Sequence, residues 1–229
     1  MKNKYYALET NGKEADIYIF GDITSWEWLE SDVSSYTLSK ELQAMDPDVE
    51  IINVHINSYG GEVAEGLAIY NSLQNHKAKV RTYCDGFACS SASIIFMAGD
   101  DRIMNAASLL FIHNAWMYAA GNAAQLRKQA DDLDTITQAS INAYMQKVSI
   151  AEDNLKELLD AETWILPNEA LDMGFATSIV GEAATSKVAA SARKAFFSLV
   201  KKVNQTPKLE PEPEPKENKP RKFVSALFR

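Results

Sequence analysis

Apolar and polar positions along the first part of the chain follow two alternating periods. Residues 16–21, DIYIFG, alternate in the manner of a strand, and residues 49–58 form a second run rich in β-branched side chains. Between these runs, residues 32–45 place apolar side chains at helical spacing, and Pro47 follows, as is usual just beyond a helix end. The pattern therefore predicts a strand, a helix and a second strand.

The same alternation continues through the rest of the chain to about residue 182. The longest helical pattern has an apolar face of four residues: Leu126, Ala130, Leu133 and Ile136. The remaining expected elements are a helix at 61–75, a strand at 79–84, a turn and a short buried helix within 85–99, a buried strand at 107–113, a long helix over 122–149, short helices near 152–160 and 167–173, and a strand near Ser178. Strands that alternate with helices at this spacing predict βαβ units and a mainly parallel sheet, hence an α/β fold.

The composition is that of an ordinary globular protein, because 46% of the 229 residues are hydrophobic and 24% are charged. This length predicts one domain with extensions. The formal net charge of −8 argues against nucleic acid as the main partner, since phosphate binding needs a concentrated basic face.

Cysteine use and the distribution of apolar residues predict a cellular location. Cys84 and Cys89 favour a reducing compartment over a disulfide framework. Residues 1–16 lack the apolar segment of a secretory signal, and no apolar run approaches the roughly 20 residues that span a bilayer. We therefore expect a cytoplasmic protein with no membrane partner.

The character of the chain changes after about residue 184. Residues 207–220, PKLEPEPEPKENKP, hold five of the seven prolines among charged residues, a composition that cannot bury enough surface to fold. The predicted division is an N-terminal segment at 1–14, a domain at 15–182, a helical extension at 183–206 and a Pro/Glu/Lys-rich disordered tail at 207–229.

The chain has three histidines that are candidates for proton transfer. His76 lies in a polar stretch at a predicted helix end, where solvent exposure is expected. His55 lies inside a strand, where a structural role is favoured. His113 closes the apolar run SLLFI at the end of a buried strand, and catalytic side chains in α/β sheets commonly occupy such strand ends.

Ser90 is a candidate nucleophile, because it lies where a strand leads into a short buried helix. A serine in this position is usually a helix cap, and Ser91 and Ser93 are neighbouring alternatives. The functional alternative is that the helix dipole and free N–H groups stabilise a developing oxyanion. Cys89 is a further candidate nucleophile, although a small buried thiol is the more common role for such a residue.

Gly60 and Gly61 stand side by side between a predicted strand and a predicted helix. A tight turn is one explanation for the pair. The other is a backbone N–H left uncovered so that it can bind an oxygen atom.

Four segments occur in an order and spacing typical of one protein family: INSYGG, CDGFACSSASIIFMAG, LLFIHNAW and AETWILPNEALDMGFAT. Together they resemble the ClpP serine-peptidase family, over about residues 15–182. The resemblance implies the ClpP/crotonase-type βαβ-repeat fold with a long handle helix. The ETW sequence and the short N-terminal segment look most like the ClpP-related head maturation proteases of tailed phages and prophages.

The resemblance also implies roles for individual residues in serine endopeptidase chemistry. Ser90 matches the nucleophile and His113 the general base, while Gly61 and Ser91 match the residues whose N–H groups form the oxyanion hole. No cofactor or metal is implied.

The third member of the catalytic triad is less directly matched. Counting back without a gap from the EALDMG segment places Glu162 at the position of the family's aspartate, and Asp160, two residues earlier, is the fallback. Either carboxylate would orient the histidine and stabilise its protonated form.

The resemblance extends to assembly and partners. Residues 116–122 and the long helix match the handle that joins two rings in this family, which implies a homo-oligomer of stacked rings, for example a tetradecamer, acting on a protein or peptide. No P-loop is present, so we do not expect this chain to hydrolyse ATP itself. The segment before residues 16–21 is short for the gate through which an unfoldase communicates in this family, so we expect processing of capsid or scaffold protein without an unfoldase. Alternatives are a proteolytic subunit that works with an ATP-driven unfoldase, an acyl-CoA hydratase or isomerase of the crotonase group, and a catalytically inactive ring or scaffold protein.

Overall fold

The structure is a computed structural model that describes residues 8–180. The predicted extension at 183–206 and the tail at 207–229 lie outside the described residues, as does the first half of the segment at 1–14. The predicted division of the chain therefore stays a prediction. No helix among the described residues is long and apolar enough to cross a membrane.

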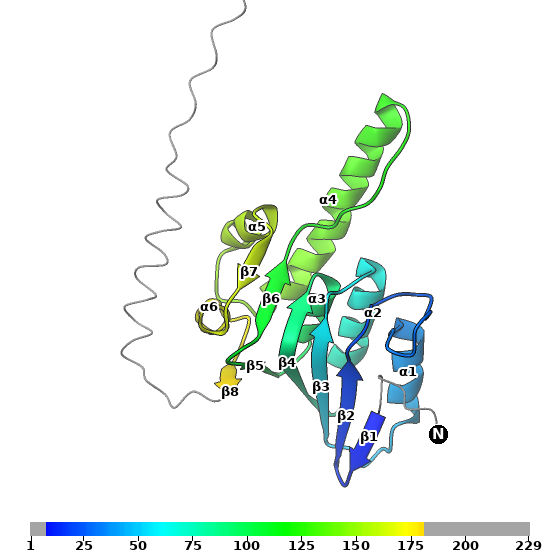
Figure 1. The fold of residues 1–229 in the computed structure, drawn as a ribbon, viewed down its shortest axis with the longest axis vertical. Helices are drawn as coiled ribbons and strands as arrows, with labels where there is room; N and C mark the ends of the chain where they lie inside the picture. Colours follow the sequence, from blue (N-terminus) through cyan, green and yellow to red (C-terminus); the bar gives the residue numbers. More distant parts are fainter. Residues whose placement is uncertain (1–7, 181–229) are drawn as a thin grey trace, which may run out of the picture. The chain divides into compact units, whose positions relative to one another are not determined.

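One sheet forms the centre of the described domain, and the strand order along its main path is β1-β2-β3-β4-β5-β8 (Figure 1). The strands along this path are β1 (Leu8–Asn11), β2 (Glu14–Ile19), β3 (Ile51–Ser58), β4 (Lys79–Cys89), β5 (Asp101–Asn105) and β8 (Ser178–Val180). The two remaining strands are β6 (Leu109–Ile112), which pairs with β4, and β7 (Thr163–Ile165), which pairs with β6. Among these pairs only β1–β2 and β6–β7 are antiparallel, so the predicted α/β fold with a mainly parallel sheet is confirmed.

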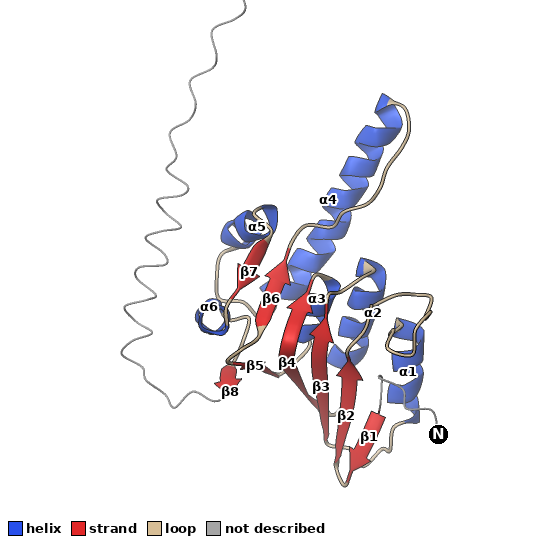
Figure 2. Ribbon diagram, in the orientation of Figure 1, coloured by secondary structure: helices blue, strands red, loops and turns tan. Residues whose placement is uncertain are grey.

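Helices cover the sheet and extend beyond it (Figure 2). They are α1 (Ser35–Ala44), α2 (Val63–Gln74), α3 (Ser91–Phe96), α4 (Ala123–Met145), α5 (Glu152–Asp160) and α6 (Pro167–Met173). The helices α1, α2 and α3 lie on one face of the sheet, and α4 projects past the ends of the strands. The alternation predicted for β2 is observed, since Ala15, Ile17 and Ile19 are fully buried and the residues between them are half-buried.

Strand β4 continues to Cys89, five residues beyond the end that the sequence pattern predicts. The turn expected directly after Cys84 is therefore wrong. The first half of β4 pairs with β5, and its second half continues along β6, with Cys89 opposite Phe111. Gly86 lies within β4, where the side chain of Asn57 packs directly against its Cα. A Cβ at this position would lie 2.5 Å from Asn57 Oδ1, so only glycine fits. That same oxygen accepts a hydrogen bond from the N–H of Phe87, so this turn-like sequence is held as a strand.

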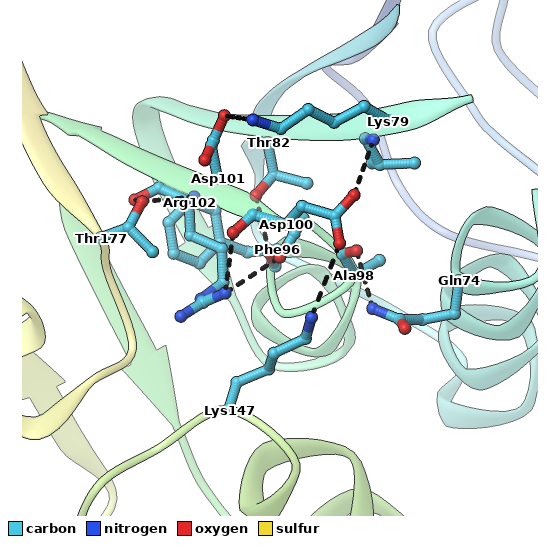
Figure 3. Close-up of polar contacts among 12 residues, drawn as sticks. Gln74, Lys79, Thr82, Phe96, Ala98, Asp100, Asp101, Arg102, Lys147 and Thr177 are labelled. Atoms are coloured by element: carbon cyan, nitrogen blue, oxygen red, sulfur yellow. Dashed lines mark hydrogen bonds and ion pairs between the residues drawn. The ribbon is translucent and has the colours of Figure 1, made fainter. Parts of the chain in front are cut away.

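Strands β1, β5 and β7 were not expected from the pattern. In β5 the charged residue Arg102 occupies a buried position, with 6% of its surface exposed. A charged residue at an inward-facing position breaks the apolar–polar alternation by which a strand is recognised in the sequence. Figure 3 shows Arg102 beside the segment that carries Thr177. Its guanidinium donates to the backbone oxygens of Phe175 at 2.8 Å, Gly99 at 2.9 Å and Gly174 at 3.2 Å. Backbone acceptors thus replace the carboxylate that a buried arginine usually requires.

The predicted apolar face of the long helix does not belong to the core of the described domain. Leu126 and Ile136 are 42% and 37% exposed, and α4 buries residues only toward its C-terminal end, including Ile141 and Tyr144. The projecting half of α4 therefore leaves its apolar side chains in solvent in the single chain.

Candidate active site

The register between β4 and β6 brings Ser90 and His113 together. Both strands run in parallel, and each residue follows the end of its strand at the same edge of the sheet. The N–H of Ser90 donates to the backbone oxygen of Phe111 at 2.8 Å, which ties the two strand ends to each other. Ser90 Oγ lies 2.8 Å from His113 Nε2, which is hydrogen-bond distance.

The backbone of Ser90 is strained, with φ 53° and ψ −126° at the start of α3. Its side chain makes no hydrogen bond to the first turn of α3, so the alternative of an ordinary helix cap is wrong. Residues with positive φ other than glycine persist only where their surroundings enforce them, and they concentrate at functional sites. Among the described residues only Ser90 and Glu162 are of this kind.

The two candidate carboxylates differ in their contacts. Asp160 Oδ1 accepts a hydrogen bond from Asn114 Nδ2 at 2.7 Å. Glu162 is exposed and accepts no hydrogen bond from any described residue. It nevertheless precedes Thr163, which is paired with Ile112 in the antiparallel β6–β7 ladder, so Glu162 and His113 leave this ladder at the same end. Neither carboxylate hydrogen-bonds to His113 within the described part of the chain.

The N–H groups of Gly61 and Ser91 donate to no acceptor among residues 8–180. The neighbouring N–H of Gly60 is already used, because it donates to Ser58 Oγ at 3.0 Å. A Cβ on Gly60 would lie 3.1 Å from Ser91 N, so the glycine pair packs directly against the peptide that follows Ser90. Both free N–H groups are thus carried by residues that meet beside Ser90.

A cleft of about 720 Å³ contains these groups, and its lining includes Ser90, His113, Gly61 and Ser91. The sequence patterns do not single out the aromatic side chain of Trp164 in its wall. Trp164 packs against Phe111 with ring centroids 4.5 Å apart and against Phe87 at 5.7 Å. Tyr144 from α4 and Glu62 also line the cleft. Glu62 directly follows the INSYGG segment, whereas Tyr144 lies outside all four matching segments and has no sequence signal of its own.

The other candidates are not equipped for nucleophilic or acid–base chemistry. Burial raises the pKa of the Cys89 thiol to about 11, which keeps the thiol protonated. His55 stacks between Tyr18 and Tyr83, and its Nδ1 lies 2.8 Å from Asp85 Oδ2, in agreement with a structural role.

The remaining histidine is less exposed than the sequence suggests. His76 is half-buried, and its Nδ1 accepts a hydrogen bond from the N–H of Ala78 at 3.1 Å. Burial, and to a smaller extent the charge of Lys77, lowers the pKa of His76. In the described part of the chain, no three side chains of His, Cys, Asp or Glu are placed to hold a metal ion.

Comparisons with known proteins agree with this geometry. The family model described as Clp protease matches residues 30–183. The ATP-dependent Clp protease proteolytic subunit of Deinococcus radiodurans is 31% identical over 143 residues, which are 62% of this chain and 70% of that protein. Proteolytic subunit 1 of Synechococcus sp. strain CC9902 is 30% identical over 150 residues, or 65% of this chain and 76% of that protein. These matches, over a parallel sheet with this cleft at its edge, show that the chain belongs to the Clp protease family.

Proposed function

We propose that this protein is a serine endopeptidase that hydrolyses peptide bonds through an acyl-enzyme. The observation that carries the proposal is the 2.8 Å contact between Ser90 Oγ and His113 Nε2 inside the cleft. A serine hydroxyl is a weak nucleophile until an adjacent base removes its proton, and this contact provides that base.

The proposed reaction has two steps. Ser90 Oγ attacks the substrate carbonyl carbon while His113 Nε2 takes its proton, and the N–H groups of Gly61 and Ser91 bind the resulting oxyanion. Collapse of the tetrahedral species breaks the C–N bond, and His113 returns the proton to the leaving amine. Water then attacks the acyl-enzyme, with His113 as base, and releases the carboxylic acid and free Ser90.

We propose Glu162 as the carboxylate that orients His113, with Asp160 as the alternative. The shared end of the β6–β7 ladder and the positive φ of 49° at Glu162 support this choice. The hydrogen bond from Asn114 occupies one oxygen of Asp160, which favours Glu162 further.

We also propose a homo-oligomer of stacked rings, of which a tetradecamer is one form. The exposed apolar residues of α4 and of the segment before it support an interface with other copies, because Tyr118 is 93% and Trp116 is 66% exposed. Such a ring would enclose the clefts and restrict them to unfolded protein or peptide.

The proposed biological role is the processing of capsid or scaffold protein in the cytoplasm during phage head maturation. Support comes from the ETW sequence at 162–164, which resembles that group of proteases. The relatives are named as ATP-dependent proteolytic subunits, which supports the alternative of a subunit that works with an unfoldase. Degradation of an unfolded protein by the purified chain without ATP would favour the first role.

The test of the activity is labelling of the purified full chain with a fluorophosphonate, followed by mapping of the modified peptide by mass spectrometry. We expect modification at Ser90, its loss in Ser90→Ala and a severe decrease in His113→Ala. His76→Ala is the matched control and should label normally. An assembled wild-type protein that does not label, or a Ser90→Ala variant with full peptidase activity, would show that the assignment is wrong and favour an inactive ring.

A further inference from the structure

The backbone oxygen of Ser90 is held by two donors from the same residue. The N–H of Ser93 donates to it at 2.9 Å and the hydroxyl of Ser93 at 2.5 Å. Ser93 Oγ also lies 2.7 Å from the hydroxyl of Tyr144, which comes from α4. Three groups therefore form a short buried chain of hydrogen bonds that ends on the carbonyl of the proposed nucleophile.

The direction of these bonds follows from the number of protons. A hydroxyl has one proton, and Ser93 gives it to a carbonyl oxygen that can only accept. Tyr144 must therefore donate to Ser93 Oγ. Burial raises the pKa of Tyr144, and the hydrogen bond with Ser93 lowers it by less, so the phenol keeps its proton.

The carbonyl of Ser90 shares a rigid peptide plane with the N–H of Ser91. In a trans peptide these two bonds point in opposite directions, so whatever holds the oxygen also orients the hydrogen. Ser93 holds the oxygen, and Tyr144 in turn holds Ser93 Oγ. The N–H of Ser91 is left with no acceptor among the described residues, next to Gly60 in the wall of the cleft.

This peptide needs such a restraint, because Ser90 adopts the positive φ of 53° that costs energy for any residue other than glycine. Without its hydrogen bonds the plane could rotate toward a relaxed conformation and carry the N–H of Ser91 away from the cleft. An oxyanion donor is effective only when it is fixed before the reaction begins.

We propose that Ser93 and Tyr144 are positioning residues that orient the N–H of Ser91 toward the oxyanion. The proposal rests on the peptidase function proposed above. It also links α4 to the chemistry, since the helix that projects from the domain carries Tyr144 at its buried end.

The test uses Tyr144→Phe and Ser93→Ala in the full chain, with Tyr70→Phe as the matched control. Tyr70 is a similarly buried tyrosine, 3% exposed against 2% for Tyr144, but its hydroxyl has no partner in the described region. The readouts are kcat and KM for a fluorogenic peptide and the inhibition constant of a peptide boronate, which forms a tetrahedral adduct with a reactive serine and therefore reports transition-state binding.

We expect kcat to fall roughly 3- to 10-fold in Tyr144→Phe and roughly 10- to 100-fold in Ser93→Ala. Neither decrease in kcat should exceed the decrease caused by removing a whole oxyanion donor. KM should stay unchanged, and the boronate should bind more weakly by the same factor as kcat. Tyr70→Phe should match the wild type in all three quantities.

The possible results separate this inference from the proposed function. A wild-type protein that neither cleaves peptides nor reacts with the boronate overturns both. A working wild type whose Tyr144→Phe variant keeps its kcat and its boronate affinity overturns the inference alone. A variant that loses thermal stability while kcat per folded subunit is unchanged also overturns it, because Tyr144 would then serve the fold only.

Discussion

Gly60 lies against Ser90 so closely that no side chain fits between them. A Cβ on Gly60 would lie 2.8 Å from Cβ of Ser90 and 2.5 Å from the backbone oxygen of Cys89. The adjacent Gly61 meets Ile23 in the same way, with a Cβ 2.0 Å from its backbone oxygen. The glycine pair is therefore explained both by close packing and by the free N–H of Gly61.

Gly60→Ala should abolish most of the peptidase activity. The added methyl must push the Ser90 turn away, and φ of +96° at this position adds strain of about 1 kcal/mol or more. Gly12→Ala is the matched control, because Gly12 also has a positive φ of +65° but nothing within 4 Å of the added Cβ. We would compare kcat and unfolding midpoints of both variants. Equal activity in the two would show that crowding at Ser90 is unimportant.

The sequence allowed most of the fold to be predicted from long patterns, and the resemblance of four segments to one family implied the central pair of the site. Alternating strands and helices specify a parallel sheet, whereas Ser90 and His113 were paired by the resemblance to the ClpP family, and the parallel ends of β4 and β6 bring them together. The strand β5 was hidden because its buried polar residue, Arg102, is satisfied by backbone oxygens far along the chain.

The third carboxylate could not be assigned from the sequence for a related reason. The position of Glu162 opposite His113 arises from β7, which has only three residues and gives no periodic signal. The sequence placed Leu126 and Ile136 on one face of α4, but an apolar stripe looks the same whether its partner is in the same chain or in another copy.

Glu162→Gln should lower kcat far more than Asp160→Asn. Loss of the orienting carboxylate in a serine–histidine system costs roughly 10⁴ in kcat, whereas Asp160→Asn should cost less than about 10-fold through the lost contact with Asn114. Steady-state kinetics of both variants with one fluorogenic peptide will decide. The reverse ranking would move the triad to Asp160.

Both cysteines should resist alkylation in the folded protein. Burial raises the pKa of Cys84 to about 12 and that of Cys89 to about 11, so the thiolate of Cys89 is roughly 100-fold scarcer at pH 8 than for a thiol of ordinary pKa 9.0. We expect iodoacetamide to leave peptidase activity intact and to modify both residues only after denaturation. Rapid modification of Cys89 with loss of activity would revive a thiol mechanism.

Arg102→Met should destabilise the domain by about 2–4 kcal/mol, because it leaves buried backbone oxygens of Phe175 and Gly99 without donors. Arg81→Met is the control, since Arg81 makes longer ion-pair contacts, 3.5 Å to Asp101 and 3.8 Å to Glu14, on the surface of the sheet. It should cost less than about 1 kcal/mol. Urea denaturation of the two variants measures the difference, and a loss of less than about 1 kcal/mol in both would mean that the hydrogen bonds from Arg102 to backbone oxygens contribute little.

His76 should make the domain less stable in mild acid. Its pKa in the folded state lies below the ordinary value of 6.5, since burial disfavours the charged ring, so the unfolded chain binds the proton more readily. The free energy of unfolding therefore falls as the pH drops below about 6.5, and the loss due to His76 is complete below its folded-state pKa. Above about pH 6.5 the contribution of His76 to stability does not change with pH.

The variant His76→Asn isolates this effect, because an amide oxygen can accept the same hydrogen bond from the N–H of Ala78 without titrating. Denaturation midpoints of the wild type and the variant should agree at pH 8. At pH 5 the variant should be the more stable of the two. If the difference between them is the same at both pH values, then His76 does not titrate with a lowered pKa, and the acid sensitivity of the domain must come from other groups.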